Sequence, residues 1–225
     1  MTKYPRGHGA DAGSEELALR FVNTLAWRNA ATPEERLPDA ESLVEWLVNS
    51  EIISPQTAGR LRKKGTRQKV EAGTVHRQAL GLREALSRLF MARTRSLTPS
   101  PEDLHVLNRI LAESKPRIAA LQEEAASGPT WRLLPSEGAA NEILAPIAWS
   151  AAELLTGPRA TRVRQCADER GCGAMFLDQS RLNNRRWCSM GDCGNRAKAK
   201  RHYLRKKQNP NAQSARANKA VRIKD

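Results

Sequence analysis

The placement of four cysteines constrains this chain most, because all four lie within 28 of its 225 residues. Cys166 and Cys172 form one close pair and, after a gap of fifteen residues, Cys188 and Cys193 form another. Two close pairs at this separation are typical of a zinc site with four thiolate ligands. Glycines flank the pairs, and glycine permits the positive-φ turns with which a backbone wraps around a metal. The spacing therefore predicts a structural zinc ion that leaves no ligand position open for catalysis.

Two other interpretations of the cysteines stay open at this point: a cluster of free thiols, or disulfides. Disulfides require an oxidising compartment. However, residues 1–13 contain no apolar core of a signal peptide, and the chain has no run of about eighteen apolar residues. We therefore expect a cytoplasmic protein whose thiols stay reduced and available to a metal.

Charge is distributed unevenly along the chain, which has a net charge of +14. Residues 159–225 hold 18 Lys and Arg against 5 Asp and Glu, whereas residues 1–158 hold 20 against 19. A cationic end on a charge-balanced body indicates a polyanionic partner. We expect nucleic acid, because neutralising its phosphates releases condensed counterions. An anionic membrane is the competing partner, but the basic segments lack the apolar face of an interfacial helix.

Composition and periodicity divide the chain into four parts. We predict a disordered N-terminus (1–13), a helical domain (14–158), a metal module with a basic helix (159–207) and a basic disordered tail (208–225). The expected fold is mainly α with a small β component: a helical N-terminal domain followed by a treble-clef-like zinc finger with four cysteine ligands. We find no internal repeat.

Apolar residues at helical spacing predict six helices in the helical domain. The predicted helices are a segment that starts at Ser14, carries an apolar stripe to Ala26 and is broken by Thr32-Pro33, a segment capped by Asp39, a segment beginning at Ser54, residues 67–95, a segment opening at Glu102, and residues 139–155. Residues 67–95 are the expected central helix, and Pro146 implies a kink or a later start in the last helix. Residues 118–121 and 130–134 are predicted to pair as a β-hairpin.

In the metal module we predict a strand at residues 163–165 and a hairpin with arms at 174–177 and 186–187, followed by a helix that starts at the metal. That helix has two cationic edges and a narrow apolar ridge, and His202 is expected to be a surface residue. The alternative is an ordinary solvated face, although so many like charges destabilise an isolated helix. The candidate nucleic-acid-binding residues are Arg181, Arg185, Arg186, Asn195, Arg196, Lys198, Lys200, Arg201, Arg205, Lys206 and Lys207.

Polar residues within apolar helices suggest a small-molecule pocket in the helical domain. Asn23 and Thr24 lie in the first predicted helix and Arg83 lies in the central one. Such residues need polar partners if they are buried. The more common alternative is that they are half-exposed or cap a neighbouring turn.

The metal module resembles the CGNR zinc finger, which is named for Cys193-Gly194-Asn195-Arg196. The same pattern includes Phe176, Asp178, Ser180, Arg186, Trp187 and Met190. The preceding domain is similar to the ABATE domain, in Phe21-Val22-Asn23-Thr24 and in residues 82–86. The resemblance implies that the four cysteines bind zinc. It also implies a zinc-stabilised DNA-binding end on a mainly helical regulatory domain, in bacterial proteins described as stress-induced transcription regulators.

Three functions are compatible with these features. The first is a DNA-binding transcription regulator whose helical domain senses a small-molecule effector or mediates association, for example as a homodimer. The second is an RNA-binding or ribosome-associated zinc protein. The third is an enzyme, which we do not expect, because the helical domain has no cysteine, only His76 and His105, and no Gly-rich phosphate loop.

Overall fold

The computed structural model describes residues 16–62, 66–114, 116–119, 130–133 and 140–208. The predictions for residues 1–13 and 209–225 lie outside this part of the chain. The helices are α1 (Leu17–Val22), α2 (Ala40–Asn49), α3 (Pro55–Leu61), α4 (Thr66–Thr94), α5 (Pro101–Glu113), α6 (Ala140–Thr156) and α7 (Asn195–Gln208). The strands are β1 (Leu25–Ala26), β2 (Glu34–Glu35), β3 (Pro116–Ala119), β4 (Thr130–Leu133), β5 (Val163–Gln165) and β6 (Met175–Leu177).

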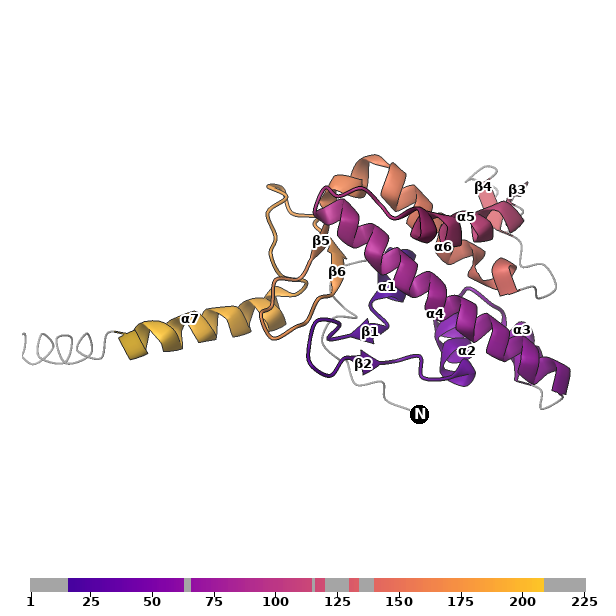
Figure 1. The fold of residues 1–225 in the computed structure, drawn as a ribbon, viewed down its shortest axis with the longest axis horizontal. Helices are drawn as coiled ribbons and strands as arrows, with labels where there is room; N and C mark the ends of the chain where they lie inside the picture. The colour runs from indigo at the N-terminus through magenta and orange to yellow at the C-terminus, as the bar shows by residue number, and fades with distance from the viewer. Residues whose placement is uncertain (1–15, 63–65, 115, 120–129, 134–139, 209–225) are drawn as a thin grey trace, which may run out of the picture.

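The predicted central helix is confirmed as α4, which packs against α1, α2, α3, α5 and α6. Figure 1 shows α4 running diagonally through the helical domain, with α5 and α6 along one of its sides. Its buried residues recur every three or four positions and include Ala79, Leu82, Leu86 and Phe90. This spacing places one apolar stripe against the core. None of the described helices is long and apolar enough to span a membrane.

Local capping signals set the starts of three helices. The Asp39 side chain accepts a hydrogen bond from the Ser42 backbone N–H in a capping box at α2. The hydroxyls of Ser54 and Ser100 cap α3 and α5, each followed by proline at the first helical position. Helix α6 is continuous from Ala140, with Pro146 inside it.

The prediction that the first helix extends to residue 26 is wrong. Helix α1 ends at Val22, and the next residues turn into β1, which pairs antiparallel with β2. Two side chains end the helix: the Thr24 hydroxyl donates to the Phe21 carbonyl, and Asn23 bonds to a strand of the metal module. Trp27 follows with a positive φ of 52°. The chain therefore reverses where apolar spacing alone would have continued the helix.

The β-hairpin predicted after α5 is confirmed, since β3 pairs antiparallel with β4. The hairpin predicted in the metal module is wrong in its pairing. Strand β6 pairs with β5, with Val163 opposite Leu177, and residues 186–187 form no strand. The cause is burial: Val163, Met175 and Leu177 belong to the apolar core of the helical domain. That core fixes β5 and β6 side by side.

Candidate metal centre and basic helix

The four cysteines meet at one point, as the sequence predicts. Their Sγ atoms lie within 4.8 Å of one another, and all four side chains are buried. The Sγ of Cys188 lies 3.7 Å from the Sγ of Cys172 and 3.7 Å from that of Cys193. A tetrahedral zinc ion with Zn–S bonds of about 2.3 Å requires sulfur–sulfur separations of about 3.8 Å. The cysteines are not joined by disulfides, so the donor set fits a tetrahedral thiolate-binding metal.

Two ligand loops deliver the cysteines. The first begins where β5 ends, and the Cys166 backbone N–H donates to the Ala174 carbonyl at 2.8 Å. The second closes in a π-helical turn, Met190–Gly194, from which α7 begins. The predicted helix that starts at the metal is therefore confirmed. His202 is exposed on α7 and does not join the cysteine cluster.

The electrostatics of the cluster favour a bound cation. Hydrogen bonds from the Cys172 and Cys188 thiols lower the pKa of Cys166 to about 2. The hydrogen bond to Cys166 raises the pKa of Cys172 and that of Cys188, and burial raises the pKa of Cys193. One thiolate is thus stabilised by its neighbours, while the others resist ionisation beside it. A divalent metal ion removes this penalty, because it neutralises several thiolates at once.

The first ligand loop is packed directly on the helical domain. The Asn29 backbone N–H donates to the Gly171 carbonyl at 3.0 Å. Gly171 has a φ of 97°, and a Cβ at this position would lie 2.4 Å from the backbone nitrogen of Ala30. Asn23 holds the start of β6: its amide donates to the Met175 carbonyl at 2.8 Å and accepts from the Met175 N–H at 2.9 Å. The helical domain therefore fixes the orientation of the metal module.

Trp27 of the helical domain is part of the metal module's own small core, which the sequence reasoning missed. Its ring packs against the cysteine cluster. The guanidinium carbons of Arg170 and Arg196 lie 5.4 Å and 5.5 Å from its ring centroid. Arg196 also donates to Cys193 Sγ at 3.1 Å and pairs with Asp168 at 3.3 Å. No local pattern signals this role, because the contact forms only when the two regions pack together.

The structure divides the predicted nucleic-acid-binding residues into two groups. The first group has its donors engaged within the protein. Arg185 donates to the Trp187 and Cys188 carbonyls, Asn195 donates to the Gly191 carbonyl, Arg196 pairs with Asp168 and Asp192, and Lys200 pairs with Glu169. The second group forms no ion pair with a described carboxylate and is exposed: Arg181, Arg186, Lys198, Arg201, Arg205, Lys206 and Lys207.

Helix α7 carries most of the second group away from the rest of the molecule. Figure 1 shows it projecting from the metal module as a single helix. It contains no acidic residue, and every residue from position 198 to position 208 is exposed. Of the predicted apolar ridge, Ala197 is half-buried and Leu204 is 41% exposed, and Tyr203 beside it is 65% exposed, so the ridge is only partly covered by the protein. Apart from Arg196 and Lys200, which pair with acidic residues, the helix thus presents cations to solvent that form no ion pair with a described carboxylate.

The residues of the predicted small-molecule pocket have protein partners. Arg83 is 3% exposed and forms a bidentate ion pair with Glu35, at 2.7 Å and 2.6 Å. It also donates to the Thr24 hydroxyl at 3.3 Å, while Asn23 is bonded to β6. These groups therefore join α1, β2, α4 and the metal module. Effector sensing through Asn23, Thr24 and Arg83 stays a prediction.

Comparison with known families assigns both regions. Residues 15–158 match the ABATE family, described as "Putative stress-induced transcription regulator", and residues 162–206 match the CGNR zinc finger. No curated protein sequence matches the chain. The two matches agree with the fold, with the four clustered cysteines and with a metal-binding role. The chain belongs to the ABATE family and carries a CGNR zinc finger after its helical domain.

Proposed function

We propose that this protein is a transcription regulator that binds duplex DNA through α7, with a structural zinc ion at the four cysteines. The observation that carries the proposal is a helix that begins next to Cys193 of the cysteine cluster and presents exposed cations, most of which form no ion pair with a described carboxylate: Lys198, Arg201, Arg205, Lys206 and Lys207. The family match supports a regulatory role, and the zinc finger match supports nucleic-acid binding.

The dimensions of α7 suit a DNA groove. Its 14 residues span about 21 Å at 1.5 Å per residue. The major groove of B-DNA is about 12 Å wide and admits an α-helix. Cations on two edges of one helix can reach the phosphates on both sides of the groove. Binding would also relieve the repulsion between like charges on α7.

The helical domain would supply regulation rather than catalysis. It buries an apolar core around α4 and fixes the metal module through the first ligand loop. The helical domain could bind a small-molecule effector or associate into a homodimer. Either event would change the position of the DNA-binding helix, because the metal module is fixed to this domain. We propose binding, and not an enzymatic reaction, as the activity of the whole chain.

The test is fluorescence anisotropy of zinc-loaded full-length protein with a labelled 20-base-pair duplex over a salt series. The affinity should fall with a log–log slope of about −0.9 for each phosphate contacted. Lys206→Gln should reduce the slope by about 0.9, whereas Arg109→Gln, which also removes one positive charge but at an exposed position of α5, should not.

Competition with a structured RNA separates DNA from RNA as the preferred partner. If RNA displaces the duplex at much lower concentration than unlabelled DNA, the partner is RNA and the DNA proposal is wrong. If neither nucleic acid binds, nucleic-acid binding itself is wrong. Selection of genomic fragments with and without a chelator would then identify the zinc-dependent DNA sites.

A further inference from the structure

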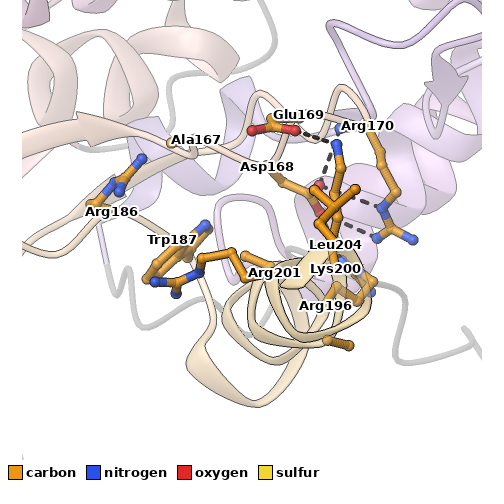
Figure 2. Close-up of a pocket in the computed structure, with 12 residues that line it drawn as sticks. Ala167, Asp168, Glu169, Arg170, Arg186, Trp187, Arg196, Lys200, Arg201 and Leu204 are labelled. Atoms are coloured by element: carbon orange, nitrogen blue, oxygen red, sulfur yellow. Dashed lines mark hydrogen bonds and ion pairs between the residues drawn. The ribbon is translucent and has the colours of Figure 1, made fainter. Parts of the chain in front are cut away.

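A groove of about 440 Å³ lies between the first ligand loop and α7. Figure 2 shows Asp168, Glu169 and Arg170 on one side of it, with Arg186 and Trp187 on the other. Helix α7 contributes a stripe at three- and four-residue spacing that includes Ala197, Lys200, Arg201 and Leu204. The groove is therefore bounded by both ligand loops and by the helix that we propose to bind DNA.

The two sides of the groove differ in whether their charges are already paired. On the first side, Asp168 pairs with Arg170 at 3.2 Å and with Arg196 at 3.3 Å. Glu169 pairs across the groove with Lys200. The carboxylates of this side are thus neutralised by cations within the protein.

On the second side, Trp187 contacts two guanidiniums that form no ion pair with a described carboxylate. The hydrogen bond from Lys200 lowers the pKa of Glu169, and the charge of Arg186 contributes to this lowering. The guanidinium carbons of Arg186 and Arg201 lie 5.3 Å and 6.0 Å from its ring centroid. A contact with an aromatic face orients a guanidinium without using its N–H donors. Neither arginine forms an ion pair with a described carboxylate. Trp187 itself packs against the buried cysteine cluster, so its ring is fixed relative to the metal site.

We propose that this groove is a phosphate-binding site in which Arg186 and Arg201 donate to the phosphate oxygens and Trp187 holds both guanidiniums in place. Planar guanidinium groups suit a phosphate because they donate two parallel hydrogen bonds. The phosphate comes either from the nucleic-acid backbone or from a free nucleotide. The first case rests on the proposed function, and the second does not depend on it.

The test uses zinc-loaded full-length protein with two probes, the labelled 20-base-pair duplex and AMP. Arg201→Gln removes one phosphate contact, so duplex binding at 0.15 M salt should weaken about fivefold and the salt slope should fall by about 0.9. Trp187→Leu changes no charge, yet it should weaken binding by at least about threefold, because both guanidiniums lose their support. Arg109→Gln is the matched control for the lost charge and should bind as the wild type does.

Zinc content and thermal unfolding are measured for each variant. If Trp187→Leu loses zinc, Arg201→Lys replaces it: this change keeps the charge, removes the guanidinium fork, and should also weaken binding. Unchanged binding of both probes by Arg201→Gln and Arg201→Lys would overturn the inference. If the wild-type protein does not bind the duplex, the proposed function is wrong, and AMP binding then tests the phosphate site by itself. Loss of AMP binding in Arg201→Gln would support the site. Absence of AMP binding by the wild-type protein would overturn it.

Discussion

The helical domain and the metal module are stabilised in different ways. The helical domain buries a large set of apolar side chains around α4, among them Leu82, Leu86 and Phe90. The module buries little besides its cysteines: Phe176 is buried with them, and Trp27 and Trp187 are partly buried around them. So small a core does not fold without support, whereas metal binding in comparable modules is worth about 10–16 kcal/mol. The difference indicates that hydrophobic burial stabilises the helical domain, and we propose that a metal at the four cysteines stabilises the module.

The boundary between the residues in the core of the helical domain and those around the cysteines does not coincide with the boundary between the two family matches. Strands β5 and β6 lie within the zinc finger match, at 162–206, yet Val163, Met175 and Leu177 belong to the core of the helical domain. Among the described residues of the module, the two ligand loops and α7 contribute no side chain to that core, although the first loop contacts Asn29 and Ala30. We therefore expect metal removal to release the loops and α7 while β5 and β6 stay on the helical domain.

Removing a metal ligand should have the largest effect. Cys193→Ser should abolish stoichiometric zinc binding and weaken DNA binding more than about 100-fold, because the start of α7 is then no longer held. Far-UV circular dichroism should retain the helical signal of α1 to α6. Ser189→Ala, in the same loop but outside the ligand set, is the control. Full DNA affinity in Cys193→Ser would contradict the prediction that DNA binding through α7 requires the metal.

A cavity in the helical domain should lower the stability of that domain and leave the metal module unaffected. Phe90 is fully buried, so Phe90→Ala should lower the free energy of unfolding by about 3–5 kcal/mol. Zinc content at 25 °C should not change, because the cysteine cluster does not contact this side chain. Urea unfolding monitored by circular dichroism measures the loss. Leu97→Ala, at a residue that is 60% exposed, should change stability by less than about 0.5 kcal/mol.

A change at the interface between the helical domain and the metal module should lower the stability by an intermediate amount. Asn23→Ala leaves the buried Met175 N–H and carbonyl without their side-chain partner, at a cost of about 1–3 kcal/mol. Because β6 follows the first ligand loop, zinc should transfer to a chelator faster than from the wild-type protein. Asn49→Ala removes an exposed amide at the end of α2 and should leave the rate unchanged. Equal rates in all three proteins would show that the helical domain does not support the metal site.

Mild acid should have the smallest effect of these changes on the stability of the helical domain. Burial opposes ionisation of Glu35, but hydrogen bonds from Arg83 and from the Leu37 backbone outweigh it and lower the pKa of Glu35. Since the folded-state pKa is lowered, this ion pair stabilises the protein fully above the unfolded-state pKa of about 4.3. Its contribution is lost only as the pH falls through the lower folded-state value. Protons compete with zinc for thiolates, so zinc release, followed with a chromogenic indicator, should precede any loss of helical signal. Simultaneous loss would contradict this order.

Local signals in the sequence predicted most of the framework. Asp39 and Ser54 mark helix starts that the structure confirms, since a cap acts on its own first turn. The cysteine spacing predicted the metal site because two short loops can place four sulfurs together with little help from the rest of the chain. The apolar period of residues 67–95 predicted α4, because one side of a central helix must be buried.

Long-range packing explains what the sequence did not predict. The apolar spacing wrongly predicted that the first helix continues past Val22, because no local sequence signal shows that Asn23 bonds to β6. Charge composition likewise does not show which donors are already used. Arg185 and Arg186 are neighbours in the sequence, but Arg185 donates to two carbonyls while Arg186 lies exposed against Trp187. The candidate nucleic-acid-binding residues therefore stay a prediction, and only the structure shows which of their donors are already engaged within the protein.

Hydrogen–deuterium exchange of the full chain before and after stoichiometric zinc removal measures whether the metal holds the ligand loops and α7. We expect residues 166–174, 186–194 and α7 to lose protection, while α4 and α6 keep theirs and β5 and β6 change little. Retained protection of the ligand loops without zinc, or equal loss of protection in α4, would contradict this expectation.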